Sequence, residues 1–264
     1  MPRFLDTRTG QFVWRDDPTN VVYAILSHTW RSAAEGGEQS YDDLRILQAE
    51  VEVTKAFPSP LSPEPDGGQV GSDPLNSTIF SHPALSDKTQ GICRIAREAG
   101  YRLVWNDACC IDKSSSAELT EAINSMFQWY RLADVCYVYL ADLPDTNASG
   151  VAFEQSKWHR RGWTLQELIA PKRVVFLNQA WCAIGTKFAL APVLENITDI
   201  DFDVLTGRAA LDSVSVARRM SWAARRETTR VEDRAYSLMG IFGVHMPTIY
   251  GEGSNAFLRL QEEI

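Results

Sequence analysis

The segment Val21-Val-Tyr-Ala-Ile-Leu26, followed directly by Ser27, His28, Thr29 and Trp30, sets the architecture of this 264-residue chain. It is a short apolar run rich in β-branched residues, which is typical of a strand buried inside a sheet. The run ends abruptly in polar and aromatic side chains. We therefore predict a buried strand whose carboxyl end carries Ser27 and His28.

Strand-like and helix-like runs alternate along the chain up to about residue 180. Three further apolar runs predict strands near 101–106, 134–140 and 173–177. Apolar residues at helical spacing predict helices near 41–53, 87–99, 117–132 and 163–169. This alternation predicts an α/β fold, with a doubly wound, mostly parallel sheet flanked by helices. No internal repeat is visible, so we treat the chain as one domain.

Two regions depart from the alternation. Residues 57–86 are rich in proline and glycine, which deny both helix and ladder hydrogen bonds. We predict a mobile insertion with little regular structure there. From about residue 181 to residue 264 we expect an extension of helices and loops added to a core that spans about 20–180.

Parallel sheets bind ligands in a crevice beyond the carboxyl ends of their strands. The polar residues at those ends are therefore the candidate site residues. Ser27 and His28 follow the first strand, Asp107 and Cys110 follow the second, and Asp142 follows the third. The site prediction thus depends on topology as well as on residue type.

The segment Arg161-Gly-Trp-Thr-Leu-Gln-Glu167-Leu168 adds an aromatic ring and a carboxylate. In a helix, Trp163 and Glu167 are four residues apart and share one face. A flat, cationic ring linked to a sugar could use both groups. The alternative is a tryptophan packed in the core and a glutamate in solvent.

Composition excludes some classes of function. The chain is 45% hydrophobic and 23% charged, as in ordinary globular proteins, and its net charge is −8. An acidic chain is a poor general binder of nucleic acid or of anionic membranes. No apolar run reaches the ~18 residues of a membrane-spanning helix, and the N-terminus lacks a signal-peptide pattern. We expect a cytoplasmic protein.

The five cysteines indicate reduced thiols. Their number is odd, Cys109 and Cys110 are adjacent, and no C-x-x-C pair occurs. Adjacent cysteines also do not match the spacing of a zinc site formed with His28. A Cys110–His28 pair for nucleophilic catalysis is a further alternative, although no cysteine-hydrolase signature surrounds it.

Three blocks of the chain resemble the motifs of the fungal heterokaryon-incompatibility (HET) domain. They are Tyr23-Ala-Ile-Leu-Ser-His-Thr-Trp30, Trp105-Asn-Asp-Ala-Cys-Cys-Ile-Asp112 and Arg161-Gly-Trp-Thr-Leu-Gln-Glu167. The segments Glu232-Asp-Arg-Ala-Tyr-Ser-Leu-Met-Gly-Ile-Phe242 and Tyr250-Gly-Glu-Gly-Ser-Asn-Ala-Phe257 also resemble this family. The resemblance implies the effector part of a protein that triggers fungal cell death, in many cases at the N-terminus of a longer chain.

HET domains are in turn similar to Toll/interleukin-receptor (TIR) domains, which have a flavodoxin-like sheet. In TIR domains that cleave NAD, the catalytic glutamate belongs to a short motif in the helix after the third strand, and Glu167 occupies that place. This resemblance implies NAD as a substrate, no metal and no further cofactor. It also implies activation by self-association, with a nucleotide-binding oligomerisation module fused to the domain or recruiting it.

The chemistry of NAD cleavage assigns roles to the neighbouring candidates. Nicotinamide is a cationic leaving group, and a carboxylate stabilises the ribosyl oxocarbenium ion that its departure creates. We expect the substrate to contact Ser27, His28, Trp30, Asp107, Cys110, Arg161 and Trp163. The rival function is a non-enzymatic, self-associating signalling module. An enzyme needs Glu167 open to a cleft, whereas a scaffold can bury it.

Overall fold

The computed structural model describes residues 1–56, 74–145 and 150–264. It shows an α/β fold built on one seven-stranded sheet with the order β2-β1-β4-β3-β5-β6-β7. The four strands predicted from sequence are all present. They form the central, parallel part of the sheet as β3 (Ala24–His28), β4 (Leu103–Trp105), β5 (Val135–Tyr139) and β6 (Val174–Leu177).

The longest pairing in the sheet joins β3 to β5. Its register runs from Ala24 opposite Val135 to His28 opposite Tyr139. Along the chain the second parallel strand, β4, lies on one side of β3, and the third, β5, lies on the other. The direction of winding therefore reverses between β3 and β5, and such a reversal opens a crevice at the carboxyl ends of the strands. Ser27 and His28 stand at this point.

Three antiparallel strands at the edges were not predicted. β1 (Arg3–Asp6) pairs with β2 (Phe12–Trp14) and with β4, and β7 (Ala183–Thr186) pairs with β6. The extension after residue 180 thus begins with a strand of the sheet, which corrects the expectation of helices and loops alone. Apolar periodicity fails in β1 because its buried residues include Arg3, which lies over the Tyr41 ring at 3.7 Å and pairs with Glu118 at 2.9 Å.

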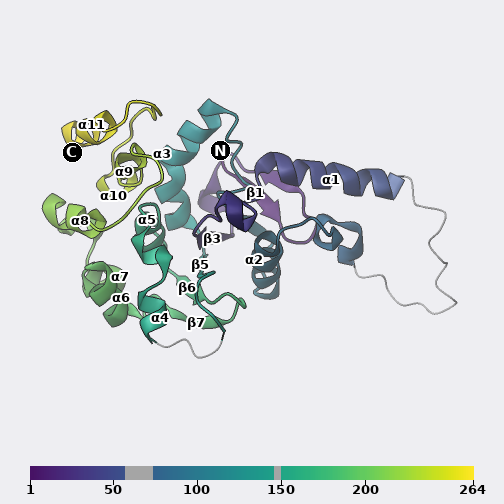
Figure 1. The fold of residues 1–264 in the computed structure, drawn as a ribbon, viewed down its shortest axis with the longest axis horizontal. Coiled ribbons are helices and arrows are strands. Elements are labelled where there is room, and N and C mark those ends of the chain that lie inside the picture. Colours follow the sequence, from purple (N-terminus) through teal and green to yellow (C-terminus); the bar gives the residue numbers. More distant parts are fainter. Residues whose placement is uncertain (57–73, 146–149) are drawn as a thin grey trace.

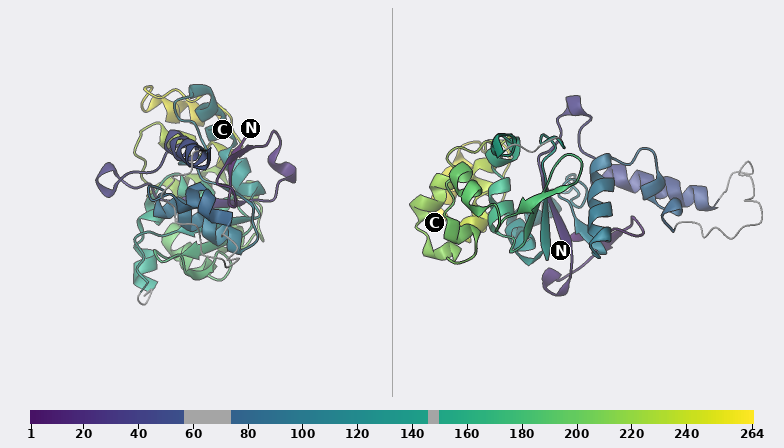
Figure 2. Two further views of the ribbon diagram at one scale, coloured as in Figure 1. Left: turned by 90° about the vertical axis from the view of Figure 1, so that its right-hand side faces the viewer. Right: turned by 90° about the horizontal axis from the view of Figure 1, so that it is seen from below.

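Helices cover both faces of the sheet. On one side lie α1 (Tyr41–Ala56) and α2 (Asp87–Glu98), and on the other lie α3 (Ser116–Leu132) and α5 (Thr164–Ile169) (Figures 1 and 2). These four helices confirm the four predicted from sequence. Ser86 caps α2 by accepting a hydrogen bond from the Thr89 backbone N–H (3.1 Å), and Ser115 caps α3 by accepting from Glu118 N–H (3.3 Å).

The proline- and glycine-rich region is only partly described. Residues 57–73 lie outside the described residues, so the prediction of mobility stands untested there. Residues 74–86 contain two 3₁₀ turns, η3 (Pro74–Ser77) and η4 (Ile79–Ser81). Ile79 and Phe80 are buried, and Ile79 fills the space beside Gly10 that a side chain would otherwise take. This part of the predicted insertion packs against the core, because its apolar residues outweigh the neighbouring prolines.

Short helices complete the fold. Between β5 and α5 lie α4 (Gly150–Glu154) and η5 (Lys157–Arg160). The extension continues with α6 (Ala191–Thr198), α7 (Phe202–Leu205), α8 (Val216–Ala223), α9 (Asp233–Tyr236), α10 (Met239–Phe242) and α11 (Asn255–Glu263). These helices gather beyond α3 and α5, away from α1 and α2 (Figures 1 and 2). Within the described ranges, no helix combines the length and apolar character needed to cross a membrane.

The contact between α10 and α3 tests whether the extension is an integral part of the domain. A Cβ atom added to Gly240 would lie 2.1 Å from Cβ of Phe127. Gly240→Ala should therefore push α10 away from α3 and lower the free energy of unfolding by about 1–3 kcal/mol, the usual cost of overpacking. Thermal denaturation followed by circular dichroism measures the loss.

Gly150→Ala is the matched control, because an added Cβ there meets nothing within 4 Å. An unchanged melting temperature for Gly240→Ala would show that the extension does not depend on this contact.

Candidate functional site

The carboxyl end of β3 presents two polar side chains to opposite faces of the sheet. Successive residues of a strand point to alternate sides, so Ser27 faces α5 whereas His28 faces α2. Ser27 is fully buried and His28 is nearly so. The residues that the sequence placed in one site therefore divide into two groups, joined through the end of a single strand.

The first group surrounds the carboxyl of Glu167 on α5. Ser27 Oγ donates a hydrogen bond to Glu167 Oε2 at 2.5 Å and accepts one from Trp158 Nε1 at 2.8 Å. Trp158 itself is held by T-shaped packing on Phe176 of β6, with ring centroids 5.6 Å apart. Because Trp158 supplies a donor to Ser27, the single hydroxyl proton of Ser27 is directed at Glu167.

Burial changes the acidity of Glu167. Its exposed fraction is 5%, and burial raises its pKa to about 8, with the charge of Asp107 adding to the increase. The hydrogen bond from Ser27 and the charges of Arg161 and Arg226 act in the opposite direction and are outweighed. Glu167 is therefore mostly protonated at neutral pH and able to lose its proton just above it.

Arg226 is a buried cation that acts on this group through its charge. Its Nη1 donates to the Arg161 carbonyl and to Thr164 Oγ1, both at 2.9 Å. Burial lowers its pKa to about 10, against the stabilising charge of Glu167. Nη2 of Arg226 is buried and has no hydrogen-bond partner among the described residues. The guanidinium thus retains one free donor beside the helix that carries Glu167.

The second group is a chain of hydrogen bonds centred on His28. Lys88 Nζ lies 3.0 Å from His28 Nδ1 and 3.1 Å from the Thr29 carbonyl, and it also pairs with Glu38. These three acceptors use all three ammonium protons of Lys88. His28 Nδ1 must then accept, so Nε2 carries the ring proton and donates it to Asp107 Oδ1 at 2.9 Å.

Asp107 anchors the outer end of this network. It also accepts from Trp30 Nε1 at 2.8 Å, and Lys113 Nζ lies 4.4 Å from the centre of the Trp30 ring. Burial alone would raise the pKa of Asp107, but its hydrogen bonds with His28 and Trp30 and the nearby Lys113 ammonium hold that pKa near 2. Asp107 is a permanent carboxylate, in contrast to Glu167.

The remaining predicted residues point elsewhere. Trp163 lies beside Asp233 of α9 and opposes the rise in the pKa of that carboxyl, and Arg161 Nη1 donates to Thr229 Oγ1 at 3.1 Å. Both side chains face the extension, whereas Glu167 turns toward Ser27. Trp163 has helical backbone angles, so the predicted spacing holds. The two side chains still meet different partners, because Trp163 lies one turn nearer the extension and meets Asp233, whereas Glu167 meets Ser27 of β3.

Cys110 is buried, and its sulfur accepts a hydrogen bond from the Asn106 backbone N–H, with 3.4 Å between sulfur and nitrogen. Both ring nitrogens of His28 are occupied by Lys88 and Asp107. His28 therefore has no free nitrogen with which to activate a cysteine, and the geometry gives a Cys110–His28 pair no support.

Sequence reasoning missed four residues that complete the two groups: Trp158, Arg226, Lys88 and Glu38. None of them stands at the end of a strand, so the topological rule could not select them. Only Lys88 carried a signal that the sequence could have shown. It stands in the first turn of a predicted helix, where a cation is unfavourable, and this position indicates a role beyond the helix itself.

The buried carboxyl makes a stability prediction. Because the folded-state pKa of Glu167 is about 8 and the ordinary value is 4.5, the folded protein holds a proton that the unfolded chain loses between those pH values. Stability should therefore fall as pH rises from about 4.5 to about 8. Glu167→Gln removes this cost, which is about 3–5 kcal/mol at pH 8.5.

Melting temperatures at pH 5 and pH 8.5 measure the effect. We expect Glu167→Gln to match or fall below the parent protein at pH 5 and to exceed it at pH 8.5. The exposed Glu154 gives the control substitution Glu154→Gln, which should change neither value. Equal pH dependence in the parent and in Glu167→Gln would disprove the raised pKa.

Comparisons with known proteins place this chain among fungal incompatibility proteins. The family described as "Heterokaryon incompatibility protein (HET)" matches residues 23–152, a range that contains β3, α2, α3 and the His28 network. The chain is 43% identical over 260 residues to the vegetative incompatibility protein HET-E-1 of Podospora anserina. The match covers 95% of this chain but only 17% of that protein's length. No solved structure matches. The chain belongs to the heterokaryon-incompatibility (HET) family.

Proposed function

We propose that this HET domain is a cell-death effector that cleaves NAD at the bond between ribose and nicotinamide, with Glu167 as the catalytic carboxylate. The observation that carries the proposal is the state of Glu167 itself. It is a buried carboxyl with a pKa near 8, fixed by Ser27 at the point where the sheet reverses its winding. Strongly perturbed carboxyls at such a place are typical of functional sites.

The reaction needs few groups. The C–N bond to nicotinamide breaks, its electron pair stays on the departing nitrogen, and the ribose carbon becomes an oxocarbenium ion. Ionised Glu167 stabilises that positive charge. Water then adds to the carbon and gives its proton to the carboxylate, which yields ADP-ribose. A carboxyl with a pKa near 8 is suited to accept this proton at physiological pH.

The resting domain keeps this chemistry inaccessible. Glu167 is 5% exposed, and its carboxyl is bound by Ser27, which Trp158 holds in turn. We infer that self-association moves Trp158 and α5 enough to admit substrate. The HET-E-1 relative is far longer than this chain, which is compatible with an oligomerisation module in the full protein driving that step.

A second candidate is a non-enzymatic signalling module, and one observation favours it. The carboxyl of Glu167 is satisfied by Ser27 in a closed interior, as a purely structural residue would be. In that case the two polar groups at the end of β3 fix the fold, and self-association alone carries the signal.

Release of nicotinamide from NAD, measured by chromatography over a range of protein concentrations, decides between these functions. We expect specific activity to rise with protein concentration and to increase from pH 6.5 to pH 8.5 as Glu167 ionises. Glu167→Gln should lower the activity by about two orders of magnitude or more, the usual effect of losing one preorganised electrostatic group. Glu154→Gln should retain it.

Full NAD cleavage by Glu167→Gln would remove Glu167 from the mechanism. Absence of cleavage by the parent protein at every concentration, with self-association intact, would favour the signalling module.

A further inference from the structure

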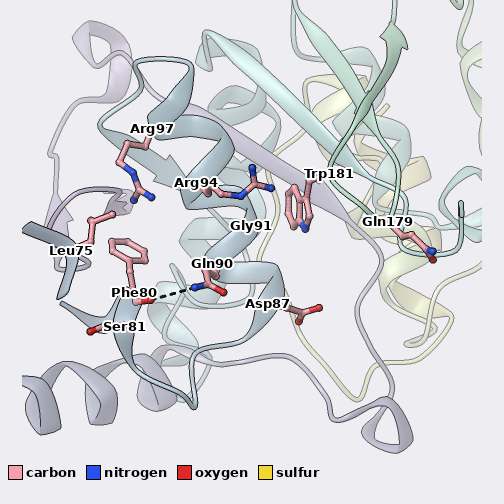
Figure 3. Close-up of a pocket in the computed structure, with 10 residues that line it drawn as sticks. All are labelled: Leu75, Phe80, Ser81, Asp87, Gln90, Gly91, Arg94, Arg97, Gln179 and Trp181. Atoms are coloured by element: carbon pink, nitrogen blue, oxygen red, sulfur yellow. Dashed lines mark hydrogen bonds between the residues drawn. The ribbon is translucent and has the colours of Figure 1, made fainter. Parts of the chain in front are cut away.

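A cavity lies on the opposite side of the sheet from Glu167. It has a volume of about 600 Å³ and is bordered by α2, by the turns η3 and η4, and by the loop between β6 and β7 (Figure 3). This volume is within the usual range for small-molecule sites. Its position on the α2 side separates it from the Ser27–Glu167 group on α5.

Trp181 forms one wall, and three features fix its ring. The indole stacks on Tyr139, with ring centroids 4.1 Å apart and an interplanar angle of 14°. Its other contact is α2 at Gly91, where an added Cβ would lie 2.1 Å from the ring. The backbone of Trp181 is left-handed, with φ of 64°. This conformation is strained for a non-glycine residue, and such strain clusters at functional sites.

Asn178 maintains the strained loop. Its Oδ1 accepts hydrogen bonds from the backbone N–H groups of Ala180 (3.1 Å) and Cys182 (2.9 Å), and its Nδ2 donates to Asp145 at 3.1 Å. Asn178 is itself buried. The loop therefore holds Trp181 in place before a ligand binds, so binding would not require the free energy of ordering this residue.

The cavity is cationic although the chain is acidic overall. Arg94 and Arg97 line it together with the amides of Gln90 and Gln179, and the guanidinium of Arg94 lies near Trp181 (Figure 3). Asp87 is the one carboxylate among the lining residues, and its charge is balanced by Arg31 at 2.7 Å. Within the described part of the chain, Arg94 forms one ion pair, an exposed contact with Glu98 at 3.4 Å, which contributes little.

From this combination we propose that the cavity binds a nucleoside phosphate. The heterocycle would pack against the open edge of the Trp181 indole, because Tyr139 and Gly91 cover its two faces. A phosphate would pair with the Arg94 guanidinium, whose forked donors suit phosphate oxygens, and the two glutamine amides would bind the sugar or base. The proposal is independent of NAD cleavage, because it concerns binding on the other face of the sheet. It gives the domain a separate site at which a nucleotide can act as an effector.

Titration of the whole chain with AMP, with adenosine and with inorganic phosphate, followed by calorimetry, tests the proposal. We expect AMP to bind at least about tenfold more tightly than either part alone, since ring and phosphate contacts add. Arg94→Gln should weaken AMP binding by about tenfold or more, the effect of one charge-assisted contact. Arg131→Gln, an exposed arginine on α3, is the matched control.

Trp181→Asn removes the ring but suits the left-handed backbone, because asparagine tolerates that conformation better than most residues. This substitution should weaken the binding of AMP and of adenosine and leave the binding of phosphate unchanged. Glu167→Gln should bind AMP like the parent protein, which separates this site from the proposed reaction. Failure of the folded parent protein to bind AMP at millimolar concentration, or equal losses in Arg94→Gln and Arg131→Gln, would overturn the proposal.

Discussion

The hydrogen bond between Ser27 and Glu167 is the interaction on which the functional face of this domain depends. It joins the central strand β3 to the short helix α5 in a region closed to water. A six-residue helix is too short to be stable alone, so its position comes from such tertiary contacts. Lys187, the residue after β7, assists by donating from Nζ to the carbonyls of Leu168 and Pro171 at the end of α5.

The same strand end organises the opposite face through His28. The Lys88–His28–Asp107 chain links an ammonium, an imidazole and a carboxylate across the carboxyl ends of β3 and β4. Each buried polar atom in it has a partner, which is the condition for a buried network to stabilise a fold. The end of β3 thus contacts Asp107, a carboxyl that stays ionised, on one side of the sheet and Glu167, a titratable carboxyl, on the other.

The central strands and helices of the fold could be predicted from the sequence. The four parallel strands and the four main helices follow from apolar runs and periodicity, because each buries a continuous apolar face. β1 could not be recognised, since a buried arginine and aspartate interrupt its pattern, and their partners Tyr41, Glu118 and Arg102 are remote in sequence. β7 was missed because three of its four residues are small or polar.

The candidate site was predictable only in part, for a physical reason. Topology selected Ser27, His28 and Asp107, and the resemblance selected Glu167. The rule of alternation along a strand then sends Ser27 and His28 to opposite sides, so these residues cannot all line one open crevice. Trp158 and Arg226 come from irregular segments, whose side-chain directions no periodicity specifies.

The central claim is that Glu167 is a buried, titratable carboxyl beside the end of β3, where the sheet reverses its winding. The most direct measurement is a pH titration of its side-chain carboxyl ¹³C resonance by NMR, assigned by its loss in Glu167→Gln. Our account predicts a midpoint near pH 8, far above that of exposed glutamates. A midpoint near 4.5, the ordinary value for glutamate, would contradict it.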